Sequence, residues 1–77
     1  MSDPGLTRDK IITDLAEVLD VAETEIVDDT NLMDMGLDSV RLMSLIERWR
    51  AAGAQRADLV VLAGDPTVGA WVRELTA

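Results

Sequence analysis

Apolar residues recur every three to four positions in four stretches of the chain, which is the spacing of one face of a helix. The first stretch begins after Thr7, a residue suited to an N-cap, and runs to about Asp20. Its apolar residues form one stripe, made by Ile11, Leu15 and Val18 and widened by Ile12 and Leu19. The pattern predicts a helix that packs this stripe against a core.

The helical pattern fails between Val21 and Asp38, where Thr, Asp and Asn accumulate. We expect a long ordered loop here, with three apolar anchors at Ile26, Leu32 and Leu37. A connection of this length is unusual in a small domain and tends to be functional. Its last residue leads directly into Ser39, so the loop is predicted to deliver that serine.

The second helix has the clearest pattern and is predicted from Ser39 to about Ala52, with Gly53 as its C-cap. Its core stripe follows the i, i+3, i+4, i+7 spacing through Leu42, Leu45, Ile46 and Trp49. Val40 and Met43 fall outside the stripe, roughly 100° to 170° away around the helix axis.

Two shorter segments follow. One is predicted after Asp58, through Leu59 to Leu62, and stops before Gly64. The other opens at Thr67, because Pro66 disfavours helix at the residue before it, and its core stripe consists of Val68, Trp71, Val72 and Leu75. Strand signals are poor, so the predicted fold is all-α: a small four-helix bundle of three main helices and one short one, with a long loop between helices 1 and 2.

The length of 77 residues indicates a single domain, 1–77, with an ordered core over about 6–76. The chain has no Cys and no His, which excludes thiolate nucleophiles, thiol metal sites and Ser-His triads. Little core remains from which to form a catalytic cavity, so a module that serves larger enzymes fits better than an enzyme. No apolar run of membrane-spanning length and no secretory signal is visible, and we expect a cytoplasmic protein without membrane contact.

The net charge of −8 argues against nucleic acid as a partner, because binding phosphates needs a basic surface. The charge is unevenly distributed. Residues 1–38 hold eleven acidic side chains against Arg8 and Lys10, whereas residues 39–77 hold four acidic side chains against five arginines. The helix after Ser39 and the following turn are therefore not acidic, with Arg41, Arg48, Arg50 and Arg56 against Glu47.

The tetrad Gly36-Leu37-Asp38-Ser39 is the strongest candidate for chemistry. A serine there lies at the positive end of a helix dipole, where a phosphodiester on its hydroxyl is electrostatically favoured. Asp38 is too weak a base to activate the serine, so another protein must do so and this chain must be its substrate. The alternative is that the tetrad only caps the helix, and Ser39 itself can act as a cap.

The acidic residues before the tetrad resemble a calcium loop only in composition. An EF-hand needs acidic or amide ligands at positions 1, 3 and 5, Gly at 6 and Glu at 12. Counting from Asp29 places Met33 at position 5 and Val40 at position 12, and counting from Asp34 places Gly36 at position 3. We therefore expect no metal site and interpret these acids as a solvated face.

The chain resembles the phosphopantetheine-binding carrier proteins over nearly its whole length, through the loop-borne DMGLDS, the preceding Leu32, the helix after it and the DPTVGAWVREL ending. The resemblance implies that Ser39 receives a 4'-phosphopantetheine arm from coenzyme A, with Gly36, Leu37 and Asp38 as the rest of the motif. Acyl groups then ride on the terminal thiol of the arm as thioesters. Ser44 lacks the Gly-x-Asp context, and Ser2 lies outside the expected core, so Ser39 is predicted to be the sole attachment site.

The runs GLDSVRLMSL and VVLAGDPTVGAW are most similar to aryl carrier domains of siderophore-type nonribosomal peptide synthesis, including those fused to isochorismatases. This similarity implies a 2,3-dihydroxybenzoate or salicylate cargo and three partners: a phosphopantetheinyl transferase, an aryl-AMP ligase and a condensation domain. The chain lacks an isochorismatase domain, so we expect either a free-standing protein or an excised piece.

By motif position, partner enzymes are expected to contact an apolar docking face made by Val40, Met43, Leu59 and Ala63. Two Trp at core positions leave little interior space, so the cargo is expected on the arm rather than in a pocket. We expect a monomer. Two other readings stay open: a carrier for an amino acid or a polyketide unit, and a helical interaction module that carries nothing.

Overall fold

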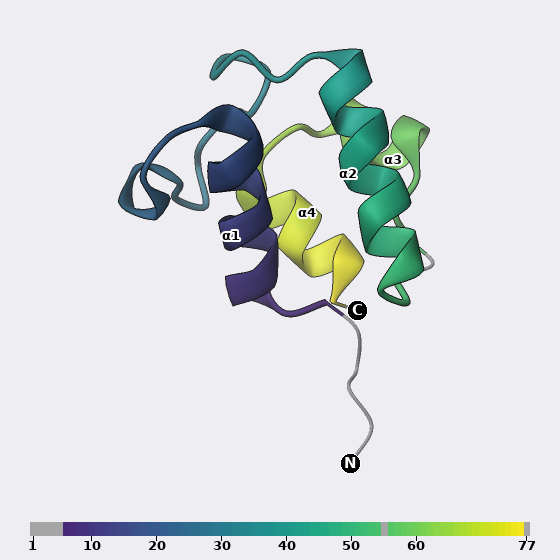
Figure 1. Ribbon diagram of the computed structural model, residues 1–77. Helices are drawn as coiled ribbons and strands as arrows, with labels where there is room; N and C mark the ends of the chain where they lie inside the picture. Colours follow the sequence, from purple (N-terminus) through teal and green to yellow (C-terminus); the bar gives the residue numbers. More distant parts are fainter. Residues whose placement is uncertain (1–5, 55, 77) are drawn as a thin grey trace.

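The computed structural model describes residues 6–54 and 56–76, and Ser2 lies outside these ranges. Over these residues the fold is all-α, with four α-helices: α1 (Arg8–Leu19), α2 (Ser39–Ala51), α3 (Leu59–Gly64) and α4 (Val68–Leu75). As Figure 1 shows, α1 and α2 run in opposite directions, and α4 lies between them. Within the described ranges the only strand-like pairing is an isolated bridge between Asn31 and Thr67. No helix in this part of the chain is long and apolar enough to cross a membrane.

Each α-helix begins with a side-chain cap, which explains why the predicted starting points are correct. The oxygens of Thr7, Asp38, Asp58 and Thr67 accept hydrogen bonds from backbone N–H groups in the first turn of α1, α2, α3 and α4, respectively. These residue types satisfy N–H groups that have no partner within the helix.

The helix ends differ slightly from the prediction. The C-cap of α2 is Ala52, and Gly53 is the next residue, with the positive φ of 104° that ends the helix. Because glycine lacks a Cβ atom, it adopts this conformation without strain. The prediction that the third helix stops before Gly64 was wrong, since α3 includes that glycine.

The predicted stripe of α2 is confirmed, because Leu42, Leu45, Ile46 and Trp49 are all buried. In α4 the buried residues are Val68, Trp71 and Leu75, whereas Val72 is only half-buried at the edge of the core. Val18 of α1 is also at the edge rather than inside. Trp49 and Trp71 meet edge to face at the centre of the bundle, with ring centroids 6.0 Å apart and planes at 81°.

The long loop is ordered by its three predicted anchors, since Ile26, Leu32 and Leu37 are all buried. It also contains a short 3-10 helix, η1 (Glu23–Glu25), which the sequence pattern did not predict. The loop backbone is bonded to the start of α4. Leu32 N–H donates to the Pro66 carbonyl at 2.8 Å, and Gly69 N–H donates to the Asp28 carbonyl at 3.0 Å. These bonds fix the path of the chain that leads to Ser39.

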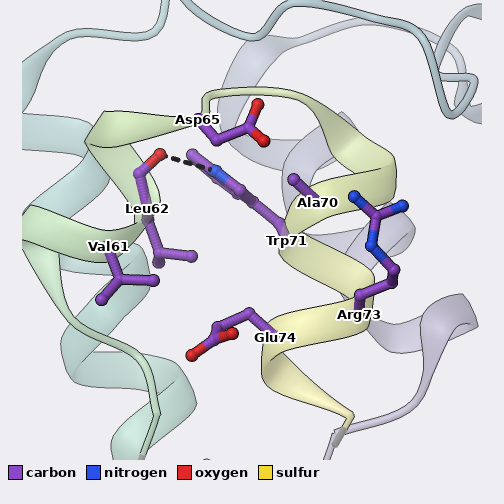
Figure 2. Close-up of a pocket in the computed structure, with 7 residues that line it drawn as sticks. All are labelled: Val61, Leu62, Asp65, Ala70, Trp71, Arg73 and Glu74. Atoms are coloured by element: carbon purple, nitrogen blue, oxygen red, sulfur yellow. Dashed lines mark hydrogen bonds between the residues drawn. The ribbon is translucent and has the colours of Figure 1, made fainter.

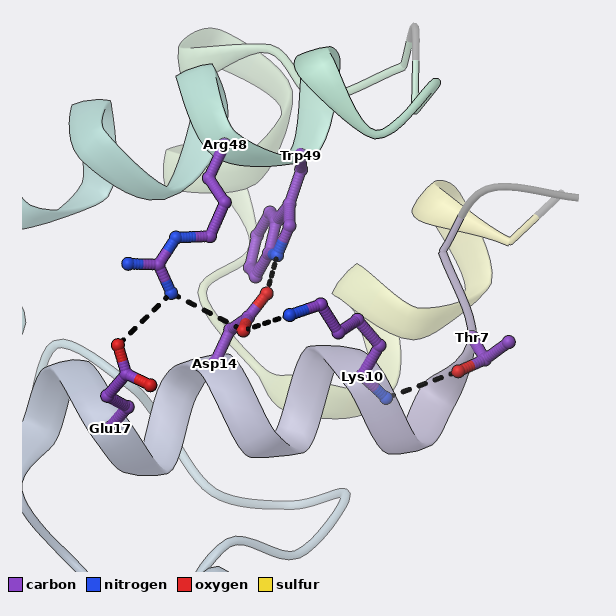
Figure 3. Close-up of polar contacts among 6 residues, drawn as sticks. All are labelled: Thr7, Lys10, Asp14, Glu17, Arg48 and Trp49. Atoms are coloured by element: carbon purple, nitrogen blue, oxygen red, sulfur yellow. Dashed lines mark hydrogen bonds and ion pairs between the residues drawn. The ribbon is translucent and has the colours of Figure 1, made fainter. Parts of the chain in front are cut away.

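Asp14 of α1 is the one buried charged residue in the part of the chain described here, with 1% of its surface exposed. Its carboxylate accepts hydrogen bonds from Lys10 Nζ at 2.9 Å, Trp49 Nε1 at 2.9 Å and Arg48 Nη1 at 3.4 Å (Figure 3). Arg48 also pairs with Glu17 Oε1 at 3.5 Å. This cluster connects α1 to α2, and the sequence analysis missed it because an acidic residue is normally assigned to the surface.

Burial by itself raises the pKa of Asp14, because it removes the charged carboxylate from water. The hydrogen bonds from Lys10 and Trp49 lower the pKa, as do the positive charges of Lys10 and Arg48. The stabilising contacts outweigh the burial, so the pKa of Asp14 lies below its ordinary value. Asp14 is therefore ionised at neutral pH and links the two helices as a charged group.

Candidate functional site

The end of the long loop is built around a turn at Gly36, which has a φ of 97°. Gly36 N–H donates to the Met33 carbonyl at 3.1 Å, and Leu37 N–H donates to the Leu32 carbonyl at 3.2 Å. A Cβ atom at Gly36 would meet nothing within 4 Å, so the turn requires glycine for its backbone conformation and not for space. The buried Leu37 side chain then anchors the chain just before the N-terminus of α2.

The side chain of Asn31 also orders this turn through hydrogen bonds to the backbone. The side-chain oxygen of Asn31 accepts hydrogen bonds from the backbone N–H of Met33 at 3.0 Å and of Asp34 at 3.1 Å. Such a contact mimics a backbone turn and is typical of Asn. The segment before Ser39 is thus held by local hydrogen bonds as well as by its anchors.

Ser39 is the first residue of α2, and its side chain is exposed. The cap is Asp38, whose Oδ1 accepts a hydrogen bond from Arg41 N–H at 2.8 Å. The expectation that Ser39 can also cap the helix was therefore wrong, because the preceding residue takes that role. Within the described residues, the Ser39 hydroxyl forms no hydrogen bond and is open to another molecule.

The surroundings of Ser39 combine a helix N-terminus with an exposed hydroxyl group. Ser39 stands at the positive end of α2, where backbone N–H groups favour a phosphodiester. The nearest carboxylate in sequence, Asp38, is already used as the cap, and the chain has no His or Cys that could act as a base. The site therefore offers an accessible nucleophile without the means to activate it.

The four residues of the expected docking face are all exposed, with exposed fractions of 76% for Val40, 43% for Met43 and 40% for Leu59. Met43 and Arg50 are seven residues apart in α2 and therefore lie on the same face of the helix. Arg50 donates from Nε to the Ala57 carbonyl at 2.7 Å, just before α3 begins. The fold thus places Met43 and α3 on one side of the molecule.

The sequence analysis missed two further exposed apolar residues in α3, Val60 at 79% and Val61 at 44%. The signal was present, because α3 contains no charged or polar side chain and a six-residue helix cannot bury all of its faces. The exposed apolar surface of α3 therefore includes Val60 and Val61 in addition to the docking face.

A cavity of about 210 Å³ lies between α3 and α4, and Figure 2 shows its lining. Val61, Leu62, Asp65, Ala70, Trp71, Arg73 and Glu74 form its walls. Ser39 does not line it, so the candidate attachment site is on the surface and not inside this cavity. Among the described residues no group of three or more Cys, His, Asp and Glu side chains could hold a metal ion.

Comparison with protein families gives a match over most of the chain. The sequence profile described as "Phosphopantetheine attachment site" matches residues 9–75, which include all four α-helices except the first residue of α1. No solved structure matches the chain.

Several curated proteins are similar to the chain. The isochorismatase of Bacillus subtilis (strain 168) is 43% identical over 70 residues, which is 91% of this chain and 22% of that protein. Enterobactin synthase component B of Escherichia coli (strain K12) is 51% identical over 49 residues, 64% of this chain and 17% of that protein. Phenyloxazoline synthase MbtB of Mycobacterium tuberculosis (strain ATCC 25618 / H37Rv) is 40% identical over 67 residues, 87% of this chain and 5% of that protein. The chain thus spans less than a quarter of the length of each of these relatives.

Proposed function

The chain belongs to the family of phosphopantetheine attachment domains, and from this premise we propose that it is an aryl carrier domain with its arm on Ser39. The family consists of carriers, which are substrates of other enzymes and do not catalyse the reactions themselves. The observation that supports Ser39 most directly is its place as the exposed first residue of α2, with its hydroxyl left out of the cap. The proposal treats 1–77 as a single carrier domain.

When bound, the 4'-phosphopantetheine arm supplies a terminal thiol that holds an acyl group as a thioester. The residues of the chain have simpler roles. Ser39 Oγ would hold the arm through a phosphodiester bond, formed as the hydroxyl loses its proton and displaces the nucleotide part of coenzyme A, and Gly36 and Leu37 hold the loop in the conformation that exposes this hydroxyl. Asp38 closes the first turn of α2 and adds a negative charge beside the site, which a transferase and its bound magnesium ion can recognise.

An aryl acid is the proposed cargo. The support is the similarity to Enterobactin synthase component B and to Phenyloxazoline synthase MbtB, together with a helix after Ser39 that is not acidic. The proposed acids are of the 2,3-dihydroxybenzoate or salicylate type. The chain aligns with only a small part of these relatives, so their complete activities do not transfer to it.

The proposed partners are a phosphopantetheinyl transferase, an aryl-AMP ligase and a condensation domain, met in turn by a monomeric carrier in the cytoplasm. The apolar docking face of Val40, Met43, Leu59 and Ala63 suits such short encounters, because small apolar patches support weak and reversible contacts.

The cargo is tested by loading the phosphopantetheinylated protein. It should be incubated with ATP and either an aryl-AMP ligase and 2,3-dihydroxybenzoate, an amino-acid adenylation enzyme, or a fatty-acyl loading enzyme. Intact mass then measures the thioester. We expect efficient loading with the aryl acid. Efficient loading only with the amino acid or the fatty acid would refute the aryl cargo and favour a carrier of another acyl group.

A further inference from the structure

The short helix α3 is held to the rest of the protein by very little apolar packing. Of its six residues, only Leu62 is buried, with 1% of its surface exposed. The cavity of about 210 Å³ has walls from both α3 and α4, so side chains do not fill this part of the space between the two helices. Packing alone leaves the orientation of α3 poorly determined, and other contacts must fix it.

Two side-chain hydrogen bonds to the backbone supply the missing constraint. Trp71 of α4 donates from Nε1 to the Leu62 carbonyl at 2.8 Å, a buried contact that Figure 2 shows at the top of the cavity. The Leu62 carbonyl is in the last turn of α3, where carbonyls lack a partner within the helix. At the other end, Arg50 of α2 donates from Nε to the carbonyl of the buried Ala57, two residues before α3.

The two tryptophans provide an internal comparison. Their rings contact each other in the core, but their N–H groups point to different helices. Trp49 donates from Nε1 to Asp14 of α1 at 2.9 Å. Trp71 donates to α3. The indole N–H of Trp49 therefore links α2 to α1, whereas the indole N–H of Trp71 links α4 to the exposed apolar helix α3.

We propose that Trp71 and Arg50 are positioning residues, which hold α3 in the orientation that the downstream partner of the carrier recognises. The inference rests on the proposed function, in which Leu59 and Ala63 of α3 belong to the docking face. Neither positioning residue contacts Ser39 in this role; they act through the placement of α3. Loss of either hydrogen bond lets α3 adopt other orientations, and the partner then meets the competent one less often.

The test compares Trp71→Phe with Trp49→Phe, since both changes keep a buried ring and remove one indole N–H. Arg50→Met is paired with Arg73→Met, which removes the same charge from a residue that does not bond the backbone around α3. Each protein is first converted to its phosphopantetheine form and loaded with 2,3-dihydroxybenzoate. Transfer by a condensation domain that accepts this aryl group then gives KM and kcat, and backbone amide chemical shifts of residues 59–64 report the position of α3.

We expect Trp71→Phe and Arg50→Met each to raise KM, by up to about fivefold, with kcat unchanged, since about fivefold is the largest population change that one typical hydrogen bond produces. Both should also displace the amide signals of α3. Trp49→Phe and Arg73→Met should leave KM unchanged and should displace the α3 amide signals less, even where Trp49→Phe lowers the melting temperature as much as Trp71→Phe. Equal effects of the two tryptophan changes, or an unchanged KM in both Trp71→Phe and Arg50→Met, would overturn the proposal.

If the proposed function is wrong, the experiment gives a result that differs from failure of the positioning role. If the wild-type protein does not accept the arm, the carrier assignment at Ser39 falls, and the amide shifts still test the position of α3. In that case, α3 signals that move no more in Trp71→Phe than in Trp49→Phe would overturn the positioning role as well. If Trp71→Phe does not fold, Arg50→Met and Arg73→Met decide the question by the same measurements.

Discussion

The carboxylate of Asp38 accepts a hydrogen bond from the backbone N–H of Arg41 at 2.8 Å, and this contact closes the first turn of α2 around Ser39. Asp38 thereby combines two properties at the proposed attachment site. It caps the helix, which is a matter of stability, and it places a negative charge next to the serine, which is a matter of recognition. The two properties can be separated by mutation, because Asn is also an efficient cap but carries no charge.

We predict that Asp38→Asn slows phosphopantetheinylation and leaves the melting temperature nearly unchanged. Asp38→Ala should slow it as well and also lose the cap, at a cost of about 1 kcal/mol of stability, with the fold otherwise intact. Modification is followed by intact mass over time and stability by thermal melting. A wild-type rate in Asp38→Asn would show that the charge has no role in recognition, and collapse of the fold in Asp38→Ala would show that Asp38 is mainly structural.

The lowered pKa of Asp14 allows a prediction of how the stability of the protein depends on pH. Its pKa in the folded protein lies below the ordinary value of 3.8, so folding favours the charged carboxylate. The stabilisation is complete well above pH 3.8 and is lost as the pH falls through the lowered pKa. Asp14→Asn should cost about 2 kcal/mol at pH 7 and make stability less dependent on pH in the acid range.

Glu17→Gln serves as the control for this prediction, because Glu17 pairs with the same Arg48 but is exposed. Exposed ion pairs contribute about 0 to 1 kcal/mol, so its acid unfolding curve should follow the wild type. Urea unfolding between pH 3 and pH 7 measures both variants. The role of Asp14 is rejected if Asp14→Asn and wild type lose stability in parallel as the solution is acidified.

The sequence was sufficient to predict the four helices, the long loop and most of the core, because these depend on local signals. Apolar stripes at helical spacing and capping residues such as Thr7 and Asp58 determine where the helices lie and begin. The anchors Leu32 and Leu37 were recognisable because isolated Leu residues in a polar loop are normally buried.

Contacts between distant residues were not predictable from the same patterns. Asp14 is buried because Trp49 and Arg48, more than 30 residues away, meet it across the helix interface. In the same way, the bond between Trp71 and Leu62 depends on how α4 crosses α3. At the candidate site, the sequence did not decide whether Ser39 or Asp38 caps α2, since both residue types can cap a helix.

The docking face and the core of α2 should respond differently to mutation. We predict that Met43→Asp and Ala63→Asp weaken transfer to the condensation partner with little change in melting temperature, because both side chains are exposed. Leu45→Ala, in the fully buried stripe, should instead cost about 2 to 5 kcal/mol of stability. Transfer rates and melting curves measure the two effects.

Thr13→Asp provides a control for the added charge, because Thr13 is exposed on α1, outside the docking face. It should transfer its cargo like the wild type. Normal transfer by both Met43→Asp and Ala63→Asp would place the docking surface elsewhere on the protein.

The central claim is that Ser39 carries the phosphopantetheine arm, and the most direct test is the intact mass of the protein after incubation with coenzyme A and a broad-specificity phosphopantetheinyl transferase. Ser44→Ala is the matched control, since Ser44 is another exposed serine in α2. We predict that wild type and Ser44→Ala each gain the mass of one phosphopantetheinyl group and that Ser39→Ala gains none. Modification that persists in Ser39→Ala, or an unmodified wild type with a transferase shown to be active on another carrier, would contradict the claim.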